Sequence, residues 1–363
     1  LAVDLPLMET AFLESLLAAQ RGIVARSDRF WEPLAAVYPR EAMLALIKSA
    51  LASGQRKLQV ILDEAQAQGL IAPLSLTDLT ARNFANLNTP EDLVGLEQGP
   101  CDEAIQLRRF RSGQGFTVNT DRVASEEPLE IRVNGTSVAV TMRTPGHDDE
   151  LATGFLFTES LIGRADEIAE IAHCPDVDPE GVGNTLDVRL LADPDLSSLT
   201  RHVFTSSSCG VCGKATITSV FQHFPPVAST FVPSPDLLLS LPMKLREAQE
   251  TFDRTGGLHA SALFSATGEL LLLREDVGRH NALDKVIGHA LRHDISLSGV
   301  ILLVSGRVSF ELMQKSLAAR IPVVAGISAP SSLAVKLARE SGQTLVGFLR
   351  EKGFNVYAGE VSG

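Results

Sequence analysis

Two of the chain's four cysteines, Cys209 and Cys212, lie three positions apart in the segment FTSSSCGVCGKATI (204–217). A structural zinc site needs four ligands, usually completed by a second Cys-x-x-Cys or by a His-x(3–5)-His pair. The other two cysteines stand alone, and the one histidine pair at that spacing, His289 and His293, falls in a predicted amphipathic helix. We therefore predict no metal site.

The cysteine pair has two further interpretations. A thioredoxin-type redox pair would need a helix that starts at the first cysteine, because the helix N-terminus lowers the thiol pKa. The Ser- and Gly-rich sequence instead predicts a mobile loop, since Gly loses the most entropy on ordering. Lys214 would favour the thiolate of Cys209, the form that attacks or carries sulfur. The pattern favours a nucleophilic thiol, with a fortuitous cysteine pair as the alternative.

Length and composition indicate a globular protein of two or three domains. The chain has 363 residues, 45% of them hydrophobic, and no apolar run approaches the ~20 residues of a membrane span. The start, LAVDLPLMETAF, lacks the basic region and cleavage site of a signal peptide, and its first residue is Leu rather than Met, so we expect sequence upstream. Four cysteines in so long a chain fit a reducing cytoplasm.

The charge is unevenly distributed. A net charge of −12 argues against nucleic-acid binding, which depends on cationic side chains at phosphates. Between Leu245 and Tyr357, 13 Lys and Arg stand against 11 Asp and Glu, so this segment carries +2 and the remainder −14. We expect an anionic small molecule to bind there.

Pattern changes divide the chain into regions. Residues 1–97 are predicted to be mainly helical after a short opening strand, because apolar residues recur at helical spacing in METAFLESLLAAQ and PREAMLALIKSALASG. Residues 98–119 are predicted to be a Gly- and acid-bearing linker. Residues 120–240 begin with a hairpin that turns at Asn134-Gly135, followed by a helix for which Thr144 is the predicted cap and Pro145 lies near its first position.

Residues 241–363 alternate strands and helices. Continuous Val/Ile/Leu strands such as GVILLVSG, joined by helices, predict an α/β fold with parallel strand pairs buried on both faces. Ligands of such sheets bind at the carboxyl ends of the strands. Those ends are SGRVSFE, ISAPSS and FLREKGF, and two of them enter helices whose free N–H groups suit phosphate.

These motifs, taken together and in order, resemble the FdhD family of formate dehydrogenase accessory sulfurtransferases over residues 120–357. The segments that carry the resemblance are MRTPGHDDELATGFLFTESLI, SSSCGVCGKA, RTGGLHASALF, REDVGRHNALDKVIG, LLVSGRVSFELMQK and SAPSSLAVKLARESGQTLVGFLREKGFNVY. The resemblance implies a cytoplasmic homodimer with a core related to cytidine deaminases and a β-rich N-terminal subdomain. It also implies a sulfur carrier that takes persulfide sulfur from a cysteine desulfurase and passes it to the molybdenum bis(molybdopterin guanine dinucleotide) cofactor of formate dehydrogenase.

The resemblance also implies site residues. The family's persulfide cysteine falls on Cys209, with Cys212 its neighbour. The family's cofactor-contacting segment falls on Phe348, Leu349, Arg350, Glu351, Lys352 and Gly353, and Arg307 stands at another strand end just before a helix. GDP is the expected mimic of the cofactor.

The N-terminal region resembles a different family. AVDLPLM and FANLNTPEDL are similar to the second half of MobA-type molybdenum cofactor guanylyltransferases, in which Asp4 would be the metal-binding aspartate. The Gly-rich nucleotide loop of that family is absent here, so we predict no transferase activity.

Two rival functions remain open at this point. A zinc deaminase would carry a Glu two positions after its first ligand and a Pro-Cys-x-x-Cys downstream, whereas LHAS places Ser261 at the Glu position and the cysteine pair lies upstream. A cofactor-binding chaperone with incidental thiols is the non-enzymatic rival.

Several polar residues have both a structural and a functional interpretation. His147, His259 and His280 would orient a substrate or be satisfied structural residues. Arg279 and Lys285 would contact phosphate or pair with the neighbouring Asp276 and Asp284.

Overall fold

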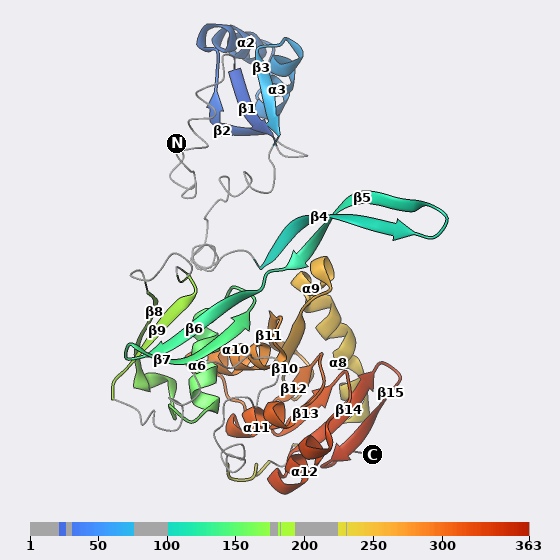
Figure 1. Cartoon of the computed structure of the whole chain (residues 1–363). Coiled ribbons are helices and arrows are strands. Elements are labelled where there is room, and N and C mark those ends of the chain that lie inside the picture. Colours follow the sequence, from blue (N-terminus) through green and yellow to red (C-terminus); the bar gives the residue numbers. More distant parts are fainter. Residues whose placement is uncertain are drawn as a thin grey trace. The chain divides into compact units, whose positions relative to one another are not determined.

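The computed structural model describes residues 22–26, 31–75, 101–174, 181, 183–192, 224–229 and 231–362. The chain forms two compact units, Leu1–Leu96 and Glu97–Gly363, which we call unit 1 and unit 2 and describe separately (Figure 1).

The described part of unit 1 is a small mixed sheet with two helices. Its elements are β1 (Gly22–Arg26), β2 (Trp31–Val37), α2 (Arg40–Ala52), α3 (Leu58–Ala67) and β3 (Ile71–Ser75). The strand order is β2-β1-β3, with β2 antiparallel and β3 parallel to β1. Trp31 is buried in the core, and its indole N–H donates to Asp63 over 2.9 Å.

The expectation of a mainly helical region is not confirmed for the described part of unit 1, which contains a three-stranded sheet beside its two helices, although the helix predicted in PREAMLALIKSALASG is confirmed as α2. The sequences GIVAR and IAPLS form strands of five residues. Apolar runs this short have no periodicity that distinguishes a strand from a helix, so tertiary pairing decides. Asp4 and the predicted helix in METAFLESLLAAQ lie outside the described residues.

Unit 2 opens with a two-stranded hairpin, β4 (Asp102–Arg111) and β5 (Gly115–Ala124), that projects from the rest of the unit (Figure 1). Asp102 anchors its base through Arg122 at 2.6 Å and Arg254 at 2.7 Å. Near the tip, the guanidinium of Arg108 lies 4.7 Å from the ring centroid of Phe116. Residues 102–119, which the sequence predicts to be part of a Gly- and acid-bearing linker, therefore belong to this hairpin, because cross-strand pairs order them.

A four-stranded sheet follows, with the order β7-β6-β9-β8. Its strands are β6 (Glu127–Val133), β7 (Thr136–Arg143), β8 (Ile168–His173) and β9 (Thr185–Leu190), and a short 3-10 helix, η2 (Ala165–Glu167), precedes β8. The predicted turn between β6 and β7 is confirmed: Asn134 and Gly135 have φ of 48° and 79°. A two-residue hairpin turn with positive φ at both positions favours this dipeptide.

Helix α6 (Asp148–Thr158) packs on this sheet, but its start differs from the prediction. The residue before the helix is His147, in the left-handed region at φ 59°, and neither Thr144 nor Pro145 belongs to the helix. The Thr144 hydroxyl is engaged elsewhere, because it donates to the carbonyl of Ser125 over 3.0 Å and accepts from the N–H of Val277 over 3.2 Å. The predicted Thr144 cap is therefore wrong.

The rest of unit 2 is a three-layer α/β structure. Its elements are α8 (Pro235–Ala248), α9 (Glu250–Thr255), β10 (His259–Phe264), β11 (Leu270–Asp276), α10 (Arg279–Arg292), β12 (Ile301–Val304), α11 (Phe310–Ala318), β13 (Val323–Gly326), α12 (Ser332–Ser341), β14 (Thr344–Arg350) and β15 (Gly353–Ala358). They form a six-stranded sheet in the order β11-β10-β12-β13-β14-β15. Strands β12, β13 and β14 are mutually parallel, which confirms the predicted parallel pairs.

Two apolar cores lie on opposite faces of this sheet. Helices α10, α11 and α12 cover one face, where Leu302 and Val324 are buried. Helix α8 covers the other face, where Ile301 and Val323 are buried. Because neighbouring residues point to opposite faces, each parallel strand must be apolar throughout, as the sequence pattern predicts.

Helices α6 and α10 cross at very close range and join the two sheets of unit 2 (Figure 1). A Cβ atom at Gly154 would lie 1.9 Å from the carbonyl oxygen of Asp284, and one at Gly288 would lie 1.8 Å from that of Glu150. Only glycine therefore permits this approach at these two positions.

Within the described residues, no helix is both long enough and apolar enough to cross a membrane.

We expect Gly154→Ala to destabilise unit 2 by about 1–3 kcal/mol or more, because the added methyl group meets backbone that cannot rotate away. Gly299→Ala is the matched control, since a Cβ atom there meets nothing within 4 Å, and its effect should stay within about 0.5 kcal/mol. Chemical denaturation of both variants measures the difference, and equal midpoints would contradict the close crossing.

Candidate functional site

The carboxyl ends of β12, β13 and β14 meet at one edge of the six-stranded sheet. β12 leads into residues 305–309 and helix α11, and β13 leads into residues 327–331 and helix α12. The two loops are tied together, because the N–H of Val308 donates to the carbonyl of Ala329 over 3.2 Å and the N–H of Ser331 donates to that of Val308 over 2.9 Å. This edge is thus ordered backbone that presents side chains from several segments.

The segment Phe348–Gly353 continues this edge at the end of β14. Phe348 has φ 53° and is 46% exposed, and its N–H donates to the carbonyl of Ser328 over 3.1 Å. One guanidinium nitrogen of Arg350 donates to the carbonyls of Ile327 and Leu349. Arg350 therefore lies against the end of β13, and Phe348 presents an exposed ring beside it.

The other predicted residues of the segment differ in their exposure. Glu351, Lys352 and Gly353 are exposed at the turn into β15. Leu349 is fully buried in the core against α8, so its side chain is not available to a ligand. Only its backbone reaches the edge.

Three further residues meet on the β10 side of the edge. Because β10 runs antiparallel to β12, His259 at its start lies near Gly306, just past the end of β12. A Cβ atom at Gly306 would lie 3.2 Å from Nδ1 of His259 and 3.7 Å from Cβ of Arg279. Arg307 is the next residue along the chain.

The electrostatics of this cluster are cationic. Burial lowers the pKa of His259, and the nearby Arg279 and Arg307 lower it further, against an opposing contribution from Asp276. His259 is therefore neutral at pH 7, because its pKa lies below the ordinary value near 6.5. Its imidazole can donate one hydrogen bond and accept another.

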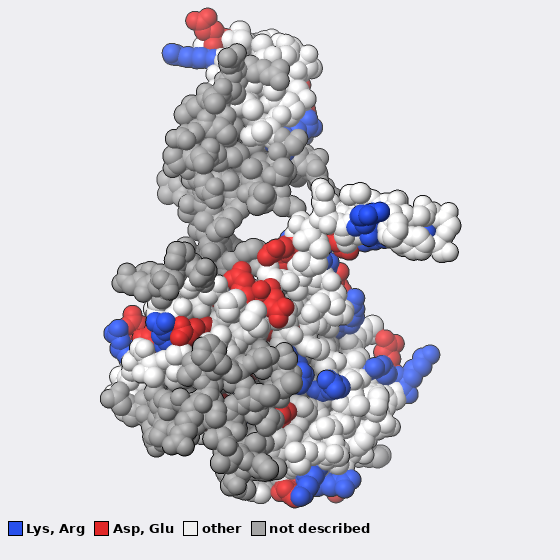
Figure 2. Space-filling view, viewed as in Figure 1, with Lys and Arg blue, Asp and Glu red and all other residues white. Residues whose placement is uncertain are grey.

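Within the described part of the chain, no ion pair joins Arg279, Arg307, Arg350 or Lys352 to a carboxylate. By contrast, several other guanidinium groups of unit 2 are paired with carboxylates, as Arg274 is with Glu150 at 2.6 Å. Figure 2 shows Lys and Arg side chains over β12 and β13, whereas Asp and Glu gather below the base of the β4–β5 hairpin. The predicted anion-binding edge thus carries cations that the protein itself does not neutralise.

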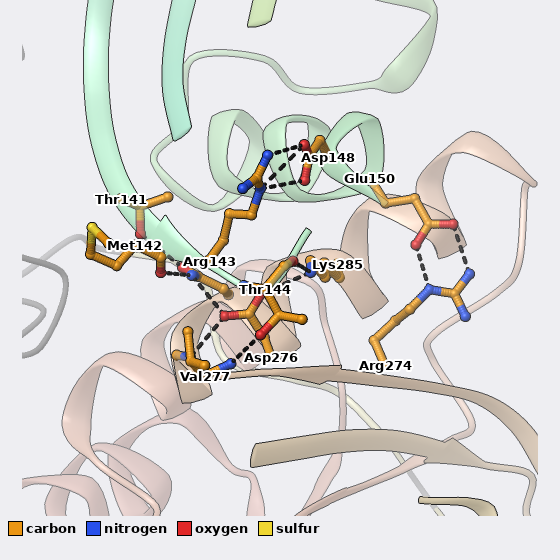
Figure 3. A network of polar contacts seen from close by, with 12 residues as sticks. Thr141, Met142, Arg143, Thr144, Asp148, Glu150, Arg274, Asp276, Val277 and Lys285 are labelled. Carbon is orange, nitrogen blue, oxygen red and sulfur yellow. Dashed lines mark hydrogen bonds and ion pairs between the residues drawn. The ribbon is translucent and has the colours of Figure 1, made fainter. Parts of the chain in front are cut away.

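A buried polar network fixes the position of this edge relative to the four-stranded sheet (Figure 3). Nζ of Lys285 lies 2.7 Å from Oδ2 of Asp276 and donates to the carbonyl of Thr144 over 2.8 Å, and the two side chains are 1% and 0% exposed. Asp276 also accepts from the N–H of Thr144 and, over 2.7 Å, from the N–H of Gly278. Of the two interpretations of Lys285, contact with phosphate or pairing with a neighbouring Asp, the structure therefore supports pairing with Asp276.

A second buried pair joins β7 to the start of α6. The guanidinium of Arg143 is 1% exposed and binds Asp148, with Nη2 at 2.9 Å from Oδ2 (Figure 3). The same side chain also contacts Glu127 at 3.2 Å. This arrangement pairs Asp148, the first residue of α6, with a buried cation.

Glu150 of α6 is held by Arg274 of β11 and by His289 of α10 at 2.7 Å. Burial alone would raise the pKa of Glu150, but hydrogen bonds from Arg274 and His147 outweigh burial and hold that pKa well below its usual range. Because the folded-state pKa lies below the unfolded one, Glu150 stabilises the fold above pH ~4.3, and this contribution is lost as the pH falls toward the folded-state pKa.

One buried ion pair was not predicted from the sequence. The sequence offers Arg279 and Lys285 as possible partners of Asp284. Nζ of Lys315 on α11 instead lies 2.8 Å from Oδ2 of Asp284 on α10, and also donates to Thr158 over 2.8 Å. Burial raises the pKa of Asp284, against the effect of Lys315. Such a pair could be found only by knowing that α10 and α11 are neighbours.

The predicted catalytic residues Cys209 and Cys212, with Lys214, lie outside the described residues. The two described cysteines, Cys101 and Cys174, form no disulfide. Within the described ranges, no group of three or more His, Cys, Asp or Glu side chains is arranged to hold a metal ion.

Comparison with known proteins places this chain in a family. A Streptomyces avermitilis protein named sulfur carrier protein FdhD is 52% identical over 275 residues, which cover 72% of this chain and 95% of the relative. A Mycolicibacterium paratuberculosis protein of the same name is 55% identical over 260 residues, covering 69% and 95%. A crystal structure from Desulfotalea psychrophila, provisionally described as a formate dehydrogenase accessory protein, matches with a TM-score of 0.56 and 27% identity, covering 71% and 97%.

The sequence profile of the FdhD/NarQ family matches residues 124–362. The chain therefore belongs to the FdhD/NarQ family, and the mixed α/β fold of unit 2 is that of its structural relative.

We expect Lys285→Met to destabilise unit 2 by about 3–5 kcal/mol, because it leaves the Asp276 carboxylate buried without its cation. Lys336→Met is the matched control, since Lys336 and Glu340 are mostly exposed and 3.9 Å apart, and it should cost less than about 1 kcal/mol. Urea denaturation of both variants provides the measurement. Similar losses would mean that the buried pair does not fix the fold.

Proposed function

We infer that this protein is a sulfur carrier and sulfurtransferase that delivers persulfide sulfur to the molybdenum bis(molybdopterin guanine dinucleotide) cofactor before its insertion into formate dehydrogenase. The observation that carries this inference is identity of about 50% to relatives named sulfur carrier protein FdhD, over 95% of their length. The cationic edge of the six-stranded sheet supports it independently, because the cofactor is an anion.

Sulfur loading would take place on Cys209. Its thiolate attacks the terminal sulfur of a persulfide on a cysteine desulfurase, a new S–S bond forms at Cys209, and the donor cysteine leaves as a thiolate. The sulfur changes carrier without an external oxidant or reductant. Cys212, three positions away, is the second thiol of the proposed site.

The cofactor is cargo, and the residues at the carboxyl edge suit it. Arg350 and Lys352 supply donors for phosphate oxygens, and the exposed ring of Phe348 can pack against a flat base. Arg307 extends the same cationic edge. The part of the cofactor that these residues recognise is a guanine nucleotide, for which GDP is the mimic.

The partners of this function are the desulfurase and formate dehydrogenase, and we propose that the protein acts as a cytoplasmic homodimer. We further propose that the six-stranded sheet with its helices is related to the cytidine deaminase core. The deaminase reaction itself is disfavoured, because the position of its catalytic Glu holds Ser261, which is buried.

Unit 1 is proposed to be part of a MobA-like nucleotidyltransferase, on the basis of AVDLPLM and FANLNTPEDL. Fusion of a nucleotidyltransferase to a sulfur carrier would be chemically consistent, because the transferase makes the cofactor to which the carrier delivers sulfur.

The persulfide is expected on Cys209. After incubation with a cysteine desulfurase and cysteine, peptide mass spectrometry should find an added sulfur in residues 204–217, and Cys209→Ala should abolish it. Cys101→Ala and Cys174→Ala are the matched controls and should load normally. An adduct that survives Cys209→Ala and maps to Cys101 or Cys174 would contradict the assignment.

Arg350→Ala is expected to weaken GDP binding by roughly 10- to 100-fold, since a charge-assisted hydrogen bond contributes about 1.5–3 kcal/mol. Persulfide loading should not change. Arg339→Ala is the control, because Arg339 is also exposed and also donates to a backbone carbonyl, that of Tyr357. Calorimetric titration with GDP measures the affinity of each variant. Equal affinities of wild type and Arg350→Ala would mean that the nucleotide binds elsewhere.

Deleting residues 1–97 should leave sulfur transfer intact, because the family match begins at residue 124. Complementation of a strain that lacks its own sulfurtransferase tests this expectation. Loss of formate dehydrogenase activity while the shortened protein stays soluble would show that unit 1 participates.

A further inference from the structure

We propose that His259, Arg279 and Arg307, grouped around Gly306, form a second anion site that binds a diphosphate group. We call it the β10 site, and we call Phe348–Gly353 the β14 site. The inference rests on the proposed function, because the dinucleotide cargo carries two diphosphates and the β14 site would hold one of them.

The geometry of the β10 site brings together three separate segments. His259 begins β10, Arg279 begins α10, and Arg307 follows β12. They converge where Gly306 has no side chain: a Cβ atom there would lie 3.2 Å from Nδ1 of His259 and 3.7 Å from Cβ of Arg279. The glycine thus lets the neutral imidazole of His259 pack against the backbone just past β12, and Arg279 and Arg307 are close enough to lower the pKa of that imidazole.

The charge of the β10 site lacks a protein counterion in the described ranges. Nε of Arg279 is buried and has no hydrogen-bond acceptor. A buried guanidinium N–H without an acceptor is costly, so an acceptor from a ligand would relieve that cost. Asp276 is the acid that raises the pKa of His259, but it is already bound to Lys285 at 2.7 Å and to the N–H of Gly278.

The start of α10 adds to the same site. Its cap is Gly278, which has no side chain, and its first turn contains no acidic residue. By contrast, Ser309 caps α11 and Ser331 caps α12 through side-chain hydrogen bonds. The first N–H groups of a helix lack intrahelical partners and favour an anion. The unpaired Arg279 and the start of α10, which has no side-chain cap, therefore both favour an anionic ligand.

The two anion sites are separate positions on one edge. The order β10-β12-β13-β14 places Gly306, past the end of β12, two strand spacings from the end of β14, about 10 Å at ~4.8 Å per spacing. A guanine nucleotide should prefer the β14 site, where Phe348 offers an exposed ring. The ring of the β10 site is the half-buried imidazole of His259, and this site should accept diphosphate alone. A ligand with two diphosphates can engage both.

Inorganic pyrophosphate is the probe, titrated by calorimetry into the full chain with Arg350→Ala, so that the β14 site is weakened. Adding Arg279→Gln or Arg307→Gln should reduce pyrophosphate affinity by roughly 10- to 100-fold. Arg292→Gln is the matched control on the same helix, because Arg292 pairs with Asp149 at 3.0 Å, and it should change the affinity less than about twofold. Thermal melts confirm that each variant is folded.

Two results would overturn the β10 site. Pyrophosphate affinity that stays within about twofold in both Arg279→Gln and Arg307→Gln would mean that the cluster binds no diphosphate. Inorganic phosphate that binds as tightly as pyrophosphate would mean a single-phosphate site unrelated to the cargo. Neither result bears on the GDP titration of Arg350→Ala in the wild-type background, so failure of the β10 site and failure of the proposed function can be told apart.

Discussion

The ion pair between Lys285 and Asp276 is the interaction on which the arrangement of unit 2 depends. Both side chains are buried, and through Thr144 they bind the segment between β7 and α6 to the end of β11 and the start of α10. Such a pair is costly to break, because removing one partner leaves a buried charge. It therefore fixes where α10 begins, and with it the position of Arg279 at the edge of the sheet.

The carboxyl edge of the six-stranded sheet is cationic, although the chain as a whole is acidic. The chain is acidic overall, and many of its arginines are paired with carboxylates, yet in the described part of the chain no carboxylate pairs with Arg279, Arg307 or Arg350. Cations held close together repel one another, and an anionic ligand that binds among them would relieve this repulsion. The same residues lie at the carboxyl ends of parallel strands, where α/β sheets bind ligands, so electrostatics and topology indicate one site.

The sequence was sufficient for features set by local rules. Asn134-Gly135 has the positive-φ preference that its hairpin turn requires. The apolar run ILLV, within a pattern that alternates strands and helices, favours a strand buried on both faces, and the structure has it as β12. The sequence was insufficient where contacts between residues far apart in the chain determine the partner of a side chain. Thr144 looks like a cap but is bound to Ser125 and Val277, and Lys315 reaches Asp284 only because α10 and α11 are neighbours. The segment Phe348–Gly353 is predicted as a binding segment from the family resemblance. That His259 and Arg279 lie close together at Gly306 could be seen only in the folded structure.

The most direct test of the central claim is native mass spectrometry of the full chain after desulfurase treatment, with and without the guanine dinucleotide cofactor. One spectrum reports oligomer, ligand and added sulfur together. The account predicts a dimer that gains sulfur without the cofactor, binds the cofactor when it is supplied, and passes the added sulfur from the protein to that cofactor. A protein that binds the cofactor yet never carries extra sulfur would contradict the account and would make it a cofactor-binding chaperone.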